Sequence, residues 1–269
     1  MDRYAVLGQP VAHSKSPKIH AAFAAQLGEK ILYEAYEIAP EELAGALTRL
    51  HGDGWRGFNL TLPHKVAAVA RCVSLSQAAE RAGAVNTLVR VDDGWHGDNT
   101  DGAGFVRDVV VNAGVPFAGK RVLVVGAGGA ARGLLAPILA EQPAELVISN
   151  RNPWKPEALA EQFKALGNIV PRTNLSLKGD RYDIVINATS AGHGGELPRL
   201  PPALFAPGAL AYDLNYGAAA QPFLDWARSE GASTVRDGLG MLVEQAAEAY
   251  ALWRGLRPET AAILAELRG

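Results

Sequence analysis

The sequence predicts an α/β protein of two domains, and three observations support that prediction. The chain has 269 residues, a length that suggests about two domains. Apolar residues make up 48% and charged residues 20% of the chain, as in globular proteins that bury a core. Short apolar runs alternate with stretches of helical periodicity, which is typical of parallel sheets with crossover helices.

The first series of elements spans residues 3–90. A strand is expected over Arg3–Gly8, followed by a helix with Ser16 as N-cap and Pro17 as its first residue. Apolar side chains at positions 19, 23 and 27 share one face of this helix, and Gly28 ends it. The remaining elements of this series are strands over Leu32–Ile38, Gly57–Thr61 and Ala84–Arg90, and helices over Glu41–Leu50 and Val66–Cys72.

The second series begins after Gly119 and has the same alternation. Its expected strands are Arg121–Val125, Glu145–Ser149, Asp183–Asn187 and Ala209–Leu214. Its expected helices are Gly126–Leu139 (which opens with a glycine-rich turn), Glu157–Leu166, Phe223–Arg228, Leu239–Trp253 and Pro258–Leu267.

Glycine pairs at 102/104 and 238/240 bracket this second series, and we expect interdomain hinges there. The predicted domains are residues 1–102, which bind the substrate, and 103–237, which bind a dinucleotide. Residues 238–269 return to the first domain, which is therefore discontinuous. A cleft between the domains is expected to hold the site.

Charge and cysteine content exclude several classes of protein. There are 26 basic and 28 acidic residues, so no basic excess is present to neutralise a nucleic acid. The single cysteine, Cys72, excludes an internal disulfide and fits a reducing compartment. We expect a cytoplasmic protein, because no secretory signal or apolar membrane span is recognised. No residue cluster has metal-ligand spacing, and the tryptophans and Tyr250 are assigned to packing.

The turn after the strand at 121–125 has the pattern of a dinucleotide site. It reads Gly126, Ala127, Gly128, Gly129, Ala130, Ala131, and it opens a helix. The first glycine allows a tight turn, the second lets the backbone reach a pyrophosphate, and the last small residue permits close helix–strand packing. A tight turn without a ligand is the alternative interpretation.

The end of the next strand favours NADP over NAD. NAD sites carry a carboxylate there for the ribose 2′-hydroxyl, whereas residues 149–152 read Ser-Asn150-Arg151-Asn. Arg151, together with Lys155, is suited to pair with a 2′-phosphate. Alternatively, Arg151 is a solvated cation at a strand end.

Four further patterns supply hydroxyls, amides, one lysine and one carboxylate, a set that suits a small hydroxylated acid. They are Ser14-Lys-Ser16-Pro, Asn59-Leu-Thr61-Leu-Pro-His-Lys65, Gly83-Ala-Val-Asn86-Thr87 and Asp98-Asn-Thr100-Asp101-Gly. Each has a structural alternative: Ser16 and Asp101 as helix caps, Lys65 as a surface cation, Thr61 as an outward strand residue, and Asn86 as part of a turn.

With these motifs the chain resembles the shikimate dehydrogenase family, essentially from end to end. Three more motifs add to the resemblance: Gly-Ala-Gly-Gly-Ala at 126–130, Asn-Ala-Thr-Ser at 187–190 and Gly-Met-Leu-Val-Glu-Gln at 240–245. The resemblance implies interconversion of 3-dehydroshikimate and shikimate with NADP in aromatic biosynthesis.

It also implies a role for individual residues. Lys65 with Asp101 performs the chemistry, and Ser14 and Ser16 bind the substrate carboxylate. The residues implied to orient the remainder of the substrate are Thr61, Asn86, Tyr216 and Gln245. Leu214, Gly238 and Met241 line the nicotinamide end of the cofactor, and Thr189 belongs to the cofactor site.

Two departures from the family pattern leave alternatives open. Asn152 stands where threonine is usual, and His64 stands where phenylalanine is common, so His64 is an alternative acid–base group. Within the family, an NAD-dependent quinate/shikimate dehydrogenase is the rival; the missing carboxylate at 149–152 and the Ser14/Ser16 pair disfavour it. A non-catalytic dinucleotide-binding regulator is the other rival, but it needs neither Lys65 nor Asp101. A monomer or a homodimer is compatible with the sequence.

Overall fold

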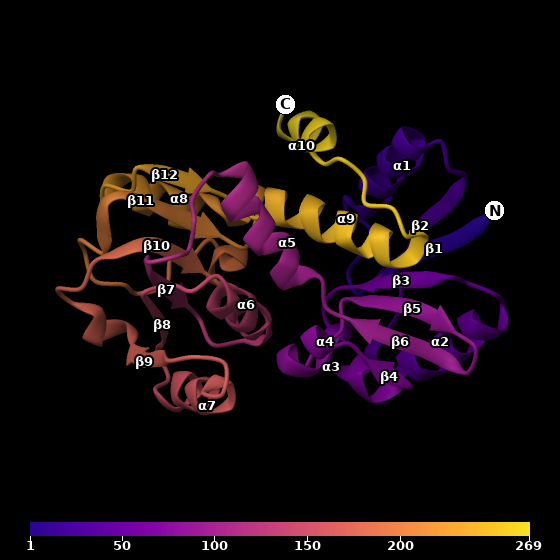
Figure 1. The fold of residues 1–269 in the computed structure, drawn as a ribbon, viewed down its shortest axis with the longest axis horizontal. Helices are drawn as coiled ribbons and strands as arrows, with labels where there is room; N and C mark the ends of the chain where they lie inside the picture. Colours follow the sequence, from indigo (N-terminus) through magenta and orange to yellow (C-terminus); the bar gives the residue numbers. More distant parts are fainter. The chain divides into compact units, whose positions relative to one another are not determined.

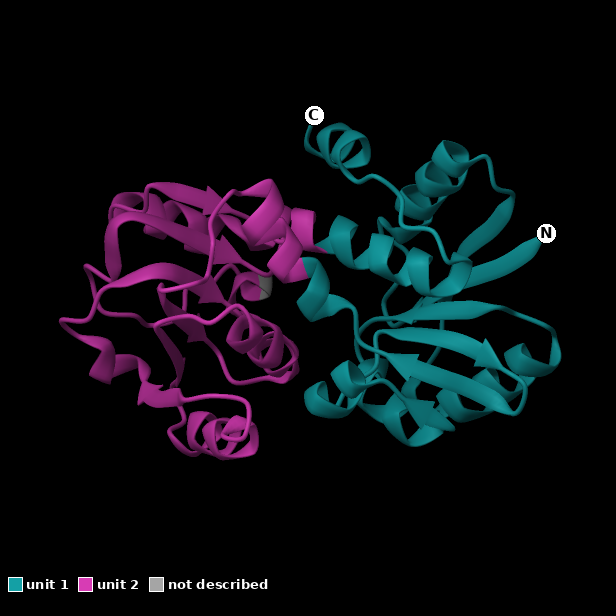
Figure 2. Cartoon of the chain, viewed as in Figure 1, with its two compact units in different colours: residues 1–104, 242–269 teal, residues 105–241 magenta. Residues whose placement is uncertain are grey.

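The computed structural model describes residues 1–192 and 194–269 and divides the chain into two compact units. Unit 1 comprises residues 1–104 and 242–269, and unit 2 comprises residues 105–241 (Figure 2). The sequence-based boundaries fall after residues 102 and 237. Helices α5 (Asp101–Arg107) and α9 (Leu239–Arg254) run across the divisions, so no loop marks either point in the sequence.

Unit 1 contains a six-stranded sheet in the order β2-β1-β3-β5-β6-β4 (Figure 1). Its strands are β1 (Asp2–Gly8), β2 (Ile31–Glu37), β3 (Gly57–Leu60), β4 (Ser74–Leu75), β5 (Thr87–Val91) and β6 (Gly94–Asp98). Its helices, apart from the shared α5 and α9, are α1 (Ser16–Leu27), α2 (Leu43–Gly52), α3 (His64–Ala67), α4 (Gln77–Ala82) and α10 (Ala261–Arg268).

The prediction of a parallel sheet is wrong for unit 1. β5 pairs antiparallel with β3 and with β6, so the sheet is mixed. β6, which the sequence analysis missed, follows β5 through the two residues Asp92 and Asp93, and Gly94 begins the return strand. Aspartate and glycine favour turns, and Asp92, Asp93 and Gly94 follow each other directly after an apolar run, so local sequence held part of the information.

Alternate residues of β1 face opposite sides of the unit 1 sheet, as the two-residue period of a strand requires. Ala5 and Leu7 pack with α2 in one core. Tyr4 and Val6 pack with Tyr33 on the other side, where Trp253 of α9 stacks on Tyr4. The sheet is therefore buried on both faces, and its polar side chains gather at strand ends.

Unit 2 contains a six-stranded, entirely parallel sheet in the order β12-β11-β10-β7-β8-β9. Its strands are β7 (Arg121–Val125), β8 (Glu145–Asn150), β9 (Ile169–Thr173), β10 (Tyr182–Asn187), β11 (Phe205–Asp213) and β12 (Thr234–Arg236). Its own helices are α6 (Gly129–Ala140), α7 (Trp154–Phe163) and α8 (Gln221–Ser229). The first strand lies in the middle and the order reverses there, which is the arrangement of Rossmann-type domains.

Helices cover both faces of this sheet. Val122 and Val124 belong to the core that contains residues of α6 and α7, whereas Leu123 and Val125 belong to the core beneath α8. The continuous apolar strand follows from this burial on two sides. The α/β class predicted from the alternation of elements is confirmed.

Two local expectations are wrong. The N-cap of α1 is Lys15, and Ser16 is the first helical residue, although Gly28 does end the helix with a φ of +67°. Trp154, assigned to packing, is 66% exposed as the first residue of α7, directly after the turn that follows β8. No helix among the described residues is long and apolar enough to cross a membrane.

Candidate active site

The candidate substrate site lies at one edge of the unit 1 sheet. β1 and β3 are parallel neighbours, so the chain leaves both at the same edge, after Gly8 and Leu60. β5 begins beside Asn59 of β3, and β6 ends at this edge with Asp98. The four polar patterns of the sequence adjoin these strand ends, so the fold brings their segments to one edge.

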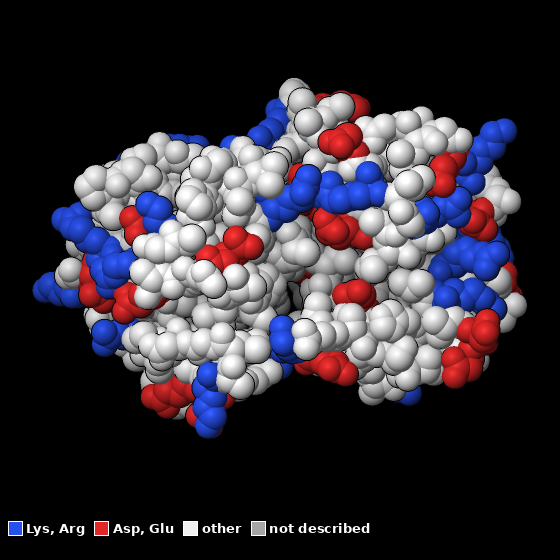
Figure 3. Space-filling view, in the orientation of Figure 1, with Lys and Arg blue, Asp and Glu red and all other residues white. Residues whose placement is uncertain are grey.

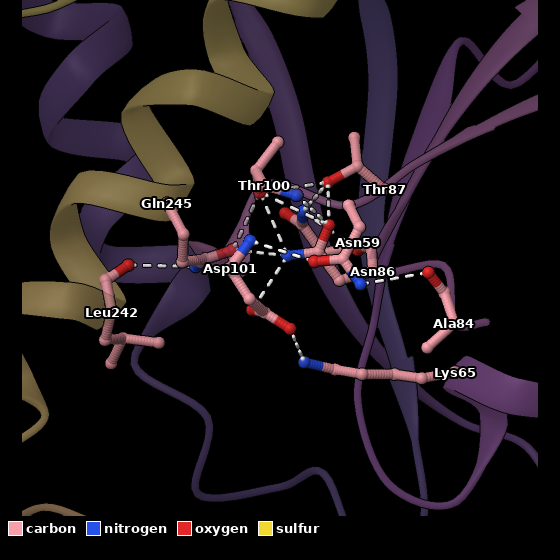
Figure 4. Close-up of polar contacts among 10 residues, drawn as sticks. Asn59, Lys65, Ala84, Asn86, Thr87, Thr100, Asp101, Leu242 and Gln245 are labelled. Carbon is pink, nitrogen blue, oxygen red and sulfur yellow. Dashed lines mark hydrogen bonds and ion pairs between the residues drawn. The ribbon is translucent and has the colours of Figure 1, made fainter. Parts of the chain in front are cut away.

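Lys65 and Asp101 form an ion pair at this edge. Lys65 lies in α3, directly after the turn that follows β3, and Asp101 is the first residue of α5. Lys65 Nζ donates to Asp101 Oδ2 at 2.6 Å (Figure 4), and their side chains are 30% and 17% exposed. The lysine is thus oriented by a carboxylate and still accessible, as a proton donor to a small molecule requires.

Asn86 joins Asp101 to Gln245 of α9. Asn86 is 1% exposed, and its Nδ2 donates to Asp101 Oδ1 at 2.9 Å and to Gln245 Oε1 at 3.1 Å. Both carboxylate oxygens of Asp101 therefore accept from side chains, one from Lys65 and one from Asn86. Figure 4 shows these groups converging, with Thr100 beside them.

Ser14, Ser16 and Thr61 lie in or beside the turns that follow β1 and β3. Ser14 Oγ accepts from the Ser16 backbone N–H at 3.3 Å, and the Thr61 N–H donates to Leu7 O. A side chain on Gly8 would come within 2.3 Å of the Thr61 methyl group, so the two turns are in close contact. The structure thus brings two predicted carboxylate-binding hydroxyls and Thr61 to neighbouring segments of one edge.

His64 is disfavoured as an acid–base group. It is 1% exposed, and its Nε2 lies 2.8 Å from the carbonyl oxygen of Ile38. A buried ring nitrogen engaged by a backbone carbonyl serves packing, as the phenylalanine common in the family would. Lys65 remains the candidate proton donor.

The glycine-rich turn of unit 2 lies where the strand order reverses. Gly126 follows β7 with a φ of +110°, and a Cβ there would come within 2.8 Å of the Ala188 carbonyl oxygen after β10. Gly128 and Gly129 have open space around them, and α6 begins at Gly129. The first N–H groups of a helix lack intrahelical acceptors and favour anions. The residues present therefore fit a dinucleotide pyrophosphate.

The adjacent strand end presents the predicted cations. Arg151 and Lys155 are exposed just beyond β8, which is the parallel neighbour of β7. Asn150 Oδ1 accepts from the Asn152 N–H at 3.3 Å, which shapes the turn that holds Arg151. This turn contains no carboxylate, so its charge suits a phosphate rather than a free ribose hydroxyl.

A buried carboxylate organises the next two strand ends and was missed by the sequence analysis. Asp213 of β11 is fully buried; its Oδ2 accepts from Asn187 at 2.8 Å, and its Oδ1 accepts from the backbone and side chain of Asn215. Asn187 Oδ1 in turn accepts from the N–H and hydroxyl of Thr189. Burial raises the pKa of Asp213 to about 6. Its position at the end of a buried strand beside Leu214 was the available signal.

The remaining predicted residues lie at the same edge of unit 2 or next to it. Leu214 and Tyr216 follow β11, and burial raises the pKa of the Tyr216 phenol. A Cβ on Gly238 would overlap the Leu214 carbonyl oxygen, so these two segments touch. The Met241 N–H donates to the buried Tyr212 hydroxyl at 3.3 Å. Tyr216 and Met241 belong to unit 2, whereas Gln245 belongs to unit 1.

The composition and the described residues indicate neither a metal site nor a basic surface for a nucleic acid. Among residues 1–192 and 194–269, no group of three His, Cys, Asp or Glu side chains could hold a metal ion. On the face that Figure 3 shows, basic and acidic side chains are interspersed within each unit, in line with the balanced composition.

A Rossmann-type unit with a glycine-rich turn, together with a unit that carries a lysine–carboxylate pair, defines the class: a two-domain α/β protein of the dehydrogenase type. Family models match residues 6–88 (shikimate dehydrogenase substrate binding domain), 110–194 (shikimate / quinate 5-dehydrogenase) and 238–268 (shikimate 5′-dehydrogenase C-terminal domain).

Several relatives are similar to this protein in sequence or structure over nearly the whole chain. The shikimate dehydrogenase (NADP(+)) of Dechloromonas aromatica is 51% identical over 267 residues, which cover 99% of this chain and 97% of the relative. A crystal structure of an Ael1 enzyme from Pseudomonas putida is 41% identical with a TM-score of 0.94 and covers 99% of this chain and 98% of the other. Shikimate 5-dehydrogenase from Thermus thermophilus, solved with NADP(H) and shikimate, is 38% identical with a TM-score of 0.87 and covers 100% and 99%. The chain belongs to the shikimate dehydrogenase family.

Proposed function

We propose that this protein reversibly reduces 3-dehydroshikimate to shikimate with NADPH, as a step of aromatic biosynthesis. The observation that carries the proposal is the Lys65–Asp101 pair, held by Asn86 at the sheet edge where the serine and threonine hydroxyls also lie. The relative at 51% identity that bears the name shikimate dehydrogenase (NADP(+)) supports the substrate and the cofactor.

Lys65 is the proposed proton donor and acceptor. NADPH, when bound, supplies a hydride to the carbonyl carbon of the substrate. Lys65 Nζ gives a proton to the carbonyl oxygen, which becomes the hydroxyl, and in the reverse direction the same nitrogen takes that proton back. Asp101 Oδ2 orients the ammonium at 2.6 Å and balances its charge.

The proposed substrate contacts are those that the family resemblance implies, and the gathering of polar side chains at one edge of the unit 1 sheet supports those that belong to unit 1. Ser14 and Ser16 donate hydroxyl hydrogens to the substrate carboxylate, and Thr61, Asn86, Tyr216 and Gln245 orient the ring hydroxyls. Quinate carries an additional hydroxyl on the ring carbon that bears the carboxylate. None of these side chains is assigned to that hydroxyl, so burying it without a partner should make quinate a poorer substrate.

The proposed cofactor contacts use the edge of unit 2. Gly126, Ala127, Gly128, Gly129 and Ala130 surround the pyrophosphate, while Asn150, Arg151 and Lys155 hold the adenosine 2′-phosphate. Leu214, Gly238 and Met241 are assigned to the nicotinamide end, and Thr189 is assigned to the cofactor site. We further infer that the protein is cytoplasmic. We also infer that it is either a monomer or a homodimer, and light scattering on the purified protein distinguishes these two states.

The test is a four-way assay of purified protein: NADP⁺ or NAD⁺ reduction with shikimate or with quinate. We expect the highest kcat/KM for shikimate with NADP⁺. Preference for quinate with NAD⁺ would establish the rival activity within the family. Cofactor binding by calorimetry without any turnover would instead support a non-catalytic regulator.

A further inference from the structure

A chain of buried hydrogen bonds extends from the Lys65–Asp101 pair into the interior of unit 1. Beyond Asn86 it passes through Thr87 to Asn59 (Figure 4), and beyond Asn59 to Tyr33 and His20. The residues beyond Asn86 are all buried: Thr87 and His20 are fully inaccessible, Asn59 is 5% exposed and Tyr33 is 9% exposed. The proposed proton transfer assigns no role to Thr87, Asn59, Tyr33 or His20.

The orientation of the Asn59 amide is fixed at both ends. On one side, Oδ1 lies 2.8 Å from the Tyr33 hydroxyl and 3.2 Å from His20 Nε2. On the other side, Nδ2 faces the Asn86 backbone carbonyl at 3.4 Å and Thr87 Oγ1 at 3.2 Å. A carbonyl can only accept, so the group that faces it must be the amide NH₂.

The orientation of Asn86 is fixed in the same way. Its Oδ1 accepts from the Thr100 backbone N–H at 2.8 Å and from the Thr87 hydroxyl at 2.9 Å. A backbone N–H can only donate, so Oδ1 must lie there and Nδ2 must point to Asp101. Thr87 is the link between the two amides: its oxygen accepts from Asn59, and its single hydrogen goes to Asn86.

We propose that Thr87 is a positioning residue for the reaction, because its hydroxyl couples Asn59 to Asn86, and Asn86 holds the carboxylate that orients Lys65. Thr87 itself is inaccessible, so it acts only through these neighbours. This inference rests on the proposed function, since the oriented group is the one that exchanges the proton.

The decisive pair of variants is Thr87→Val and Thr87→Ser. Valine has the shape of threonine without the hydroxyl. It removes one donor to Asn86 Oδ1, which keeps the Thr100 donors, and it leaves one Asn59 amide hydrogen without a partner. We expect kcat to fall about tenfold in Thr87→Val, the size of a lost buried hydrogen bond, with KM for shikimate within about threefold. Thr87→Ser retains the link and should keep kcat within about twofold of wild type, although it loses a methyl group.

Two measurements distinguish a positioning role of Thr87 from a role in the stability of the fold alone. The pH at half-maximal kcat should move in Thr87→Val and not in Thr87→Ser. Thr260→Val is the matched control: Thr260 is buried in the same unit and donates to Glu244 at 2.6 Å, outside the site. Its Tm should fall while kcat and the pH profile stay at wild-type values.

Equal kcat losses in the valine and serine variants, or an unchanged pH profile in Thr87→Val, would overturn the inference. If Thr87→Val does not fold, Tyr33→Phe decides: it removes one donor to Asn59 and should lower kcat about two- to threefold, and a wild-type kcat there overturns the inference. The Tyr33 hydroxyl also hydrogen-bonds Ser16, and the loss of that bond is measured separately as a rise in KM for shikimate. Wild-type protein without activity on shikimate rejects the proposed function instead, so the two failures are distinguishable.

Discussion

The two units bury polar groups at their functional edges by different means. Unit 1 uses neutral amides and hydroxyls, with the buried His20 ring stacked 4.1 Å from Tyr33 at the far end of the network. Unit 2 uses a carboxylate, Asp213, that accepts from Asn187 and Asn215. A neutral network is insensitive to pH near neutrality, whereas a buried carboxylate titrates.

Acid should therefore change the stability of the two edges in opposite directions. Burial lowers the pKa of His20 to about 3, so the native state keeps this ring neutral while the unfolded chain protonates it. Burial raises the pKa of Asp213, so the native state binds a proton more readily than the unfolded chain does. The two edges should differ in kinetics too: changes at the Lys65–Asp101 pair should alter kcat, and changes at the cofactor-binding turns of unit 2 should alter cofactor affinity.

The largest effect is expected at Lys65. Lys65→Met keeps most of the length of the side chain but has no proton to transfer, and a positioned acid–base group contributes about 10²- to 10⁴-fold to the rate. We expect kcat to fall by that factor while KM for NADP⁺ is unchanged. Steady-state kinetics with NADP⁺ saturating, after circular dichroism confirms folding, provide the measurement.

Asp101→Asn sharpens the same test. It keeps the shape of the side chain and loses the charge that holds the ammonium, so a smaller loss of kcat with some rise in KM is expected. Near-wild-type kcat in Lys65→Met would remove the lysine from the chemistry.

The second-largest effect is expected in the pH dependence of the free energy of unfolding, and its source is Asp213. Because its pKa is about 6 in the native protein and 3.8 in the reference state, its stabilising contribution is full below pH 3.8 and is lost as pH rises through about 6. Two pH units correspond to about 3 kcal/mol. Urea unfolding of wild type and Asp213→Asn between pH 4 and 7.5 measures this: the wild-type advantage should shrink as pH rises. A difference independent of pH would contradict it.

A substitution of Arg151 tests whether the cofactor-binding turn of unit 2 controls NADP affinity without affecting kcat. A charged hydrogen bond is worth about 1.5–3 kcal/mol, so Arg151→Ala should weaken NADP binding about 10- to 150-fold. Use of NAD and kcat at saturation should barely change. Arg228→Ala, which removes an exposed arginine of α8, is the control and should leave the binding of both cofactors unchanged. Equal losses with NADP and NAD would show that Arg151 is structural.

The smallest effect is the pH dependence from His20. Its stabilising contribution is full above pH 6.5 and is lost as pH falls toward about 3, at about 1.4 kcal/mol per pH unit. From pH 6.5 to 5 the wild type should therefore lose about 2 kcal/mol relative to His20→Phe, which keeps an aromatic ring against Tyr33. Parallel stability curves for the two proteins in this range would refute the neutral, buried state of His20.

Sequence alone determined the features that depend on residues adjacent in the chain. The glycine-rich turn at 126–131 needs only a strand before it and a helix after it, and the structure has both. The absence of a carboxylate at 149–152 is likewise local, as are the strand at the N-terminus and the helix end at Gly28. Local rules of backbone conformation and periodicity suffice for such features.

Which side chains meet, and which are buried, depends on packing between segments that lie far apart in the chain. Asn86 bonds Gln245 across 159 positions, and Asn59 is opposite Thr87 because β3 and β5 share an antiparallel register. Burial removed His64 from the candidates and gave Asp213 its raised pKa. Strand register and burial follow from packing of cores on both faces of each sheet, and no single segment contains that information.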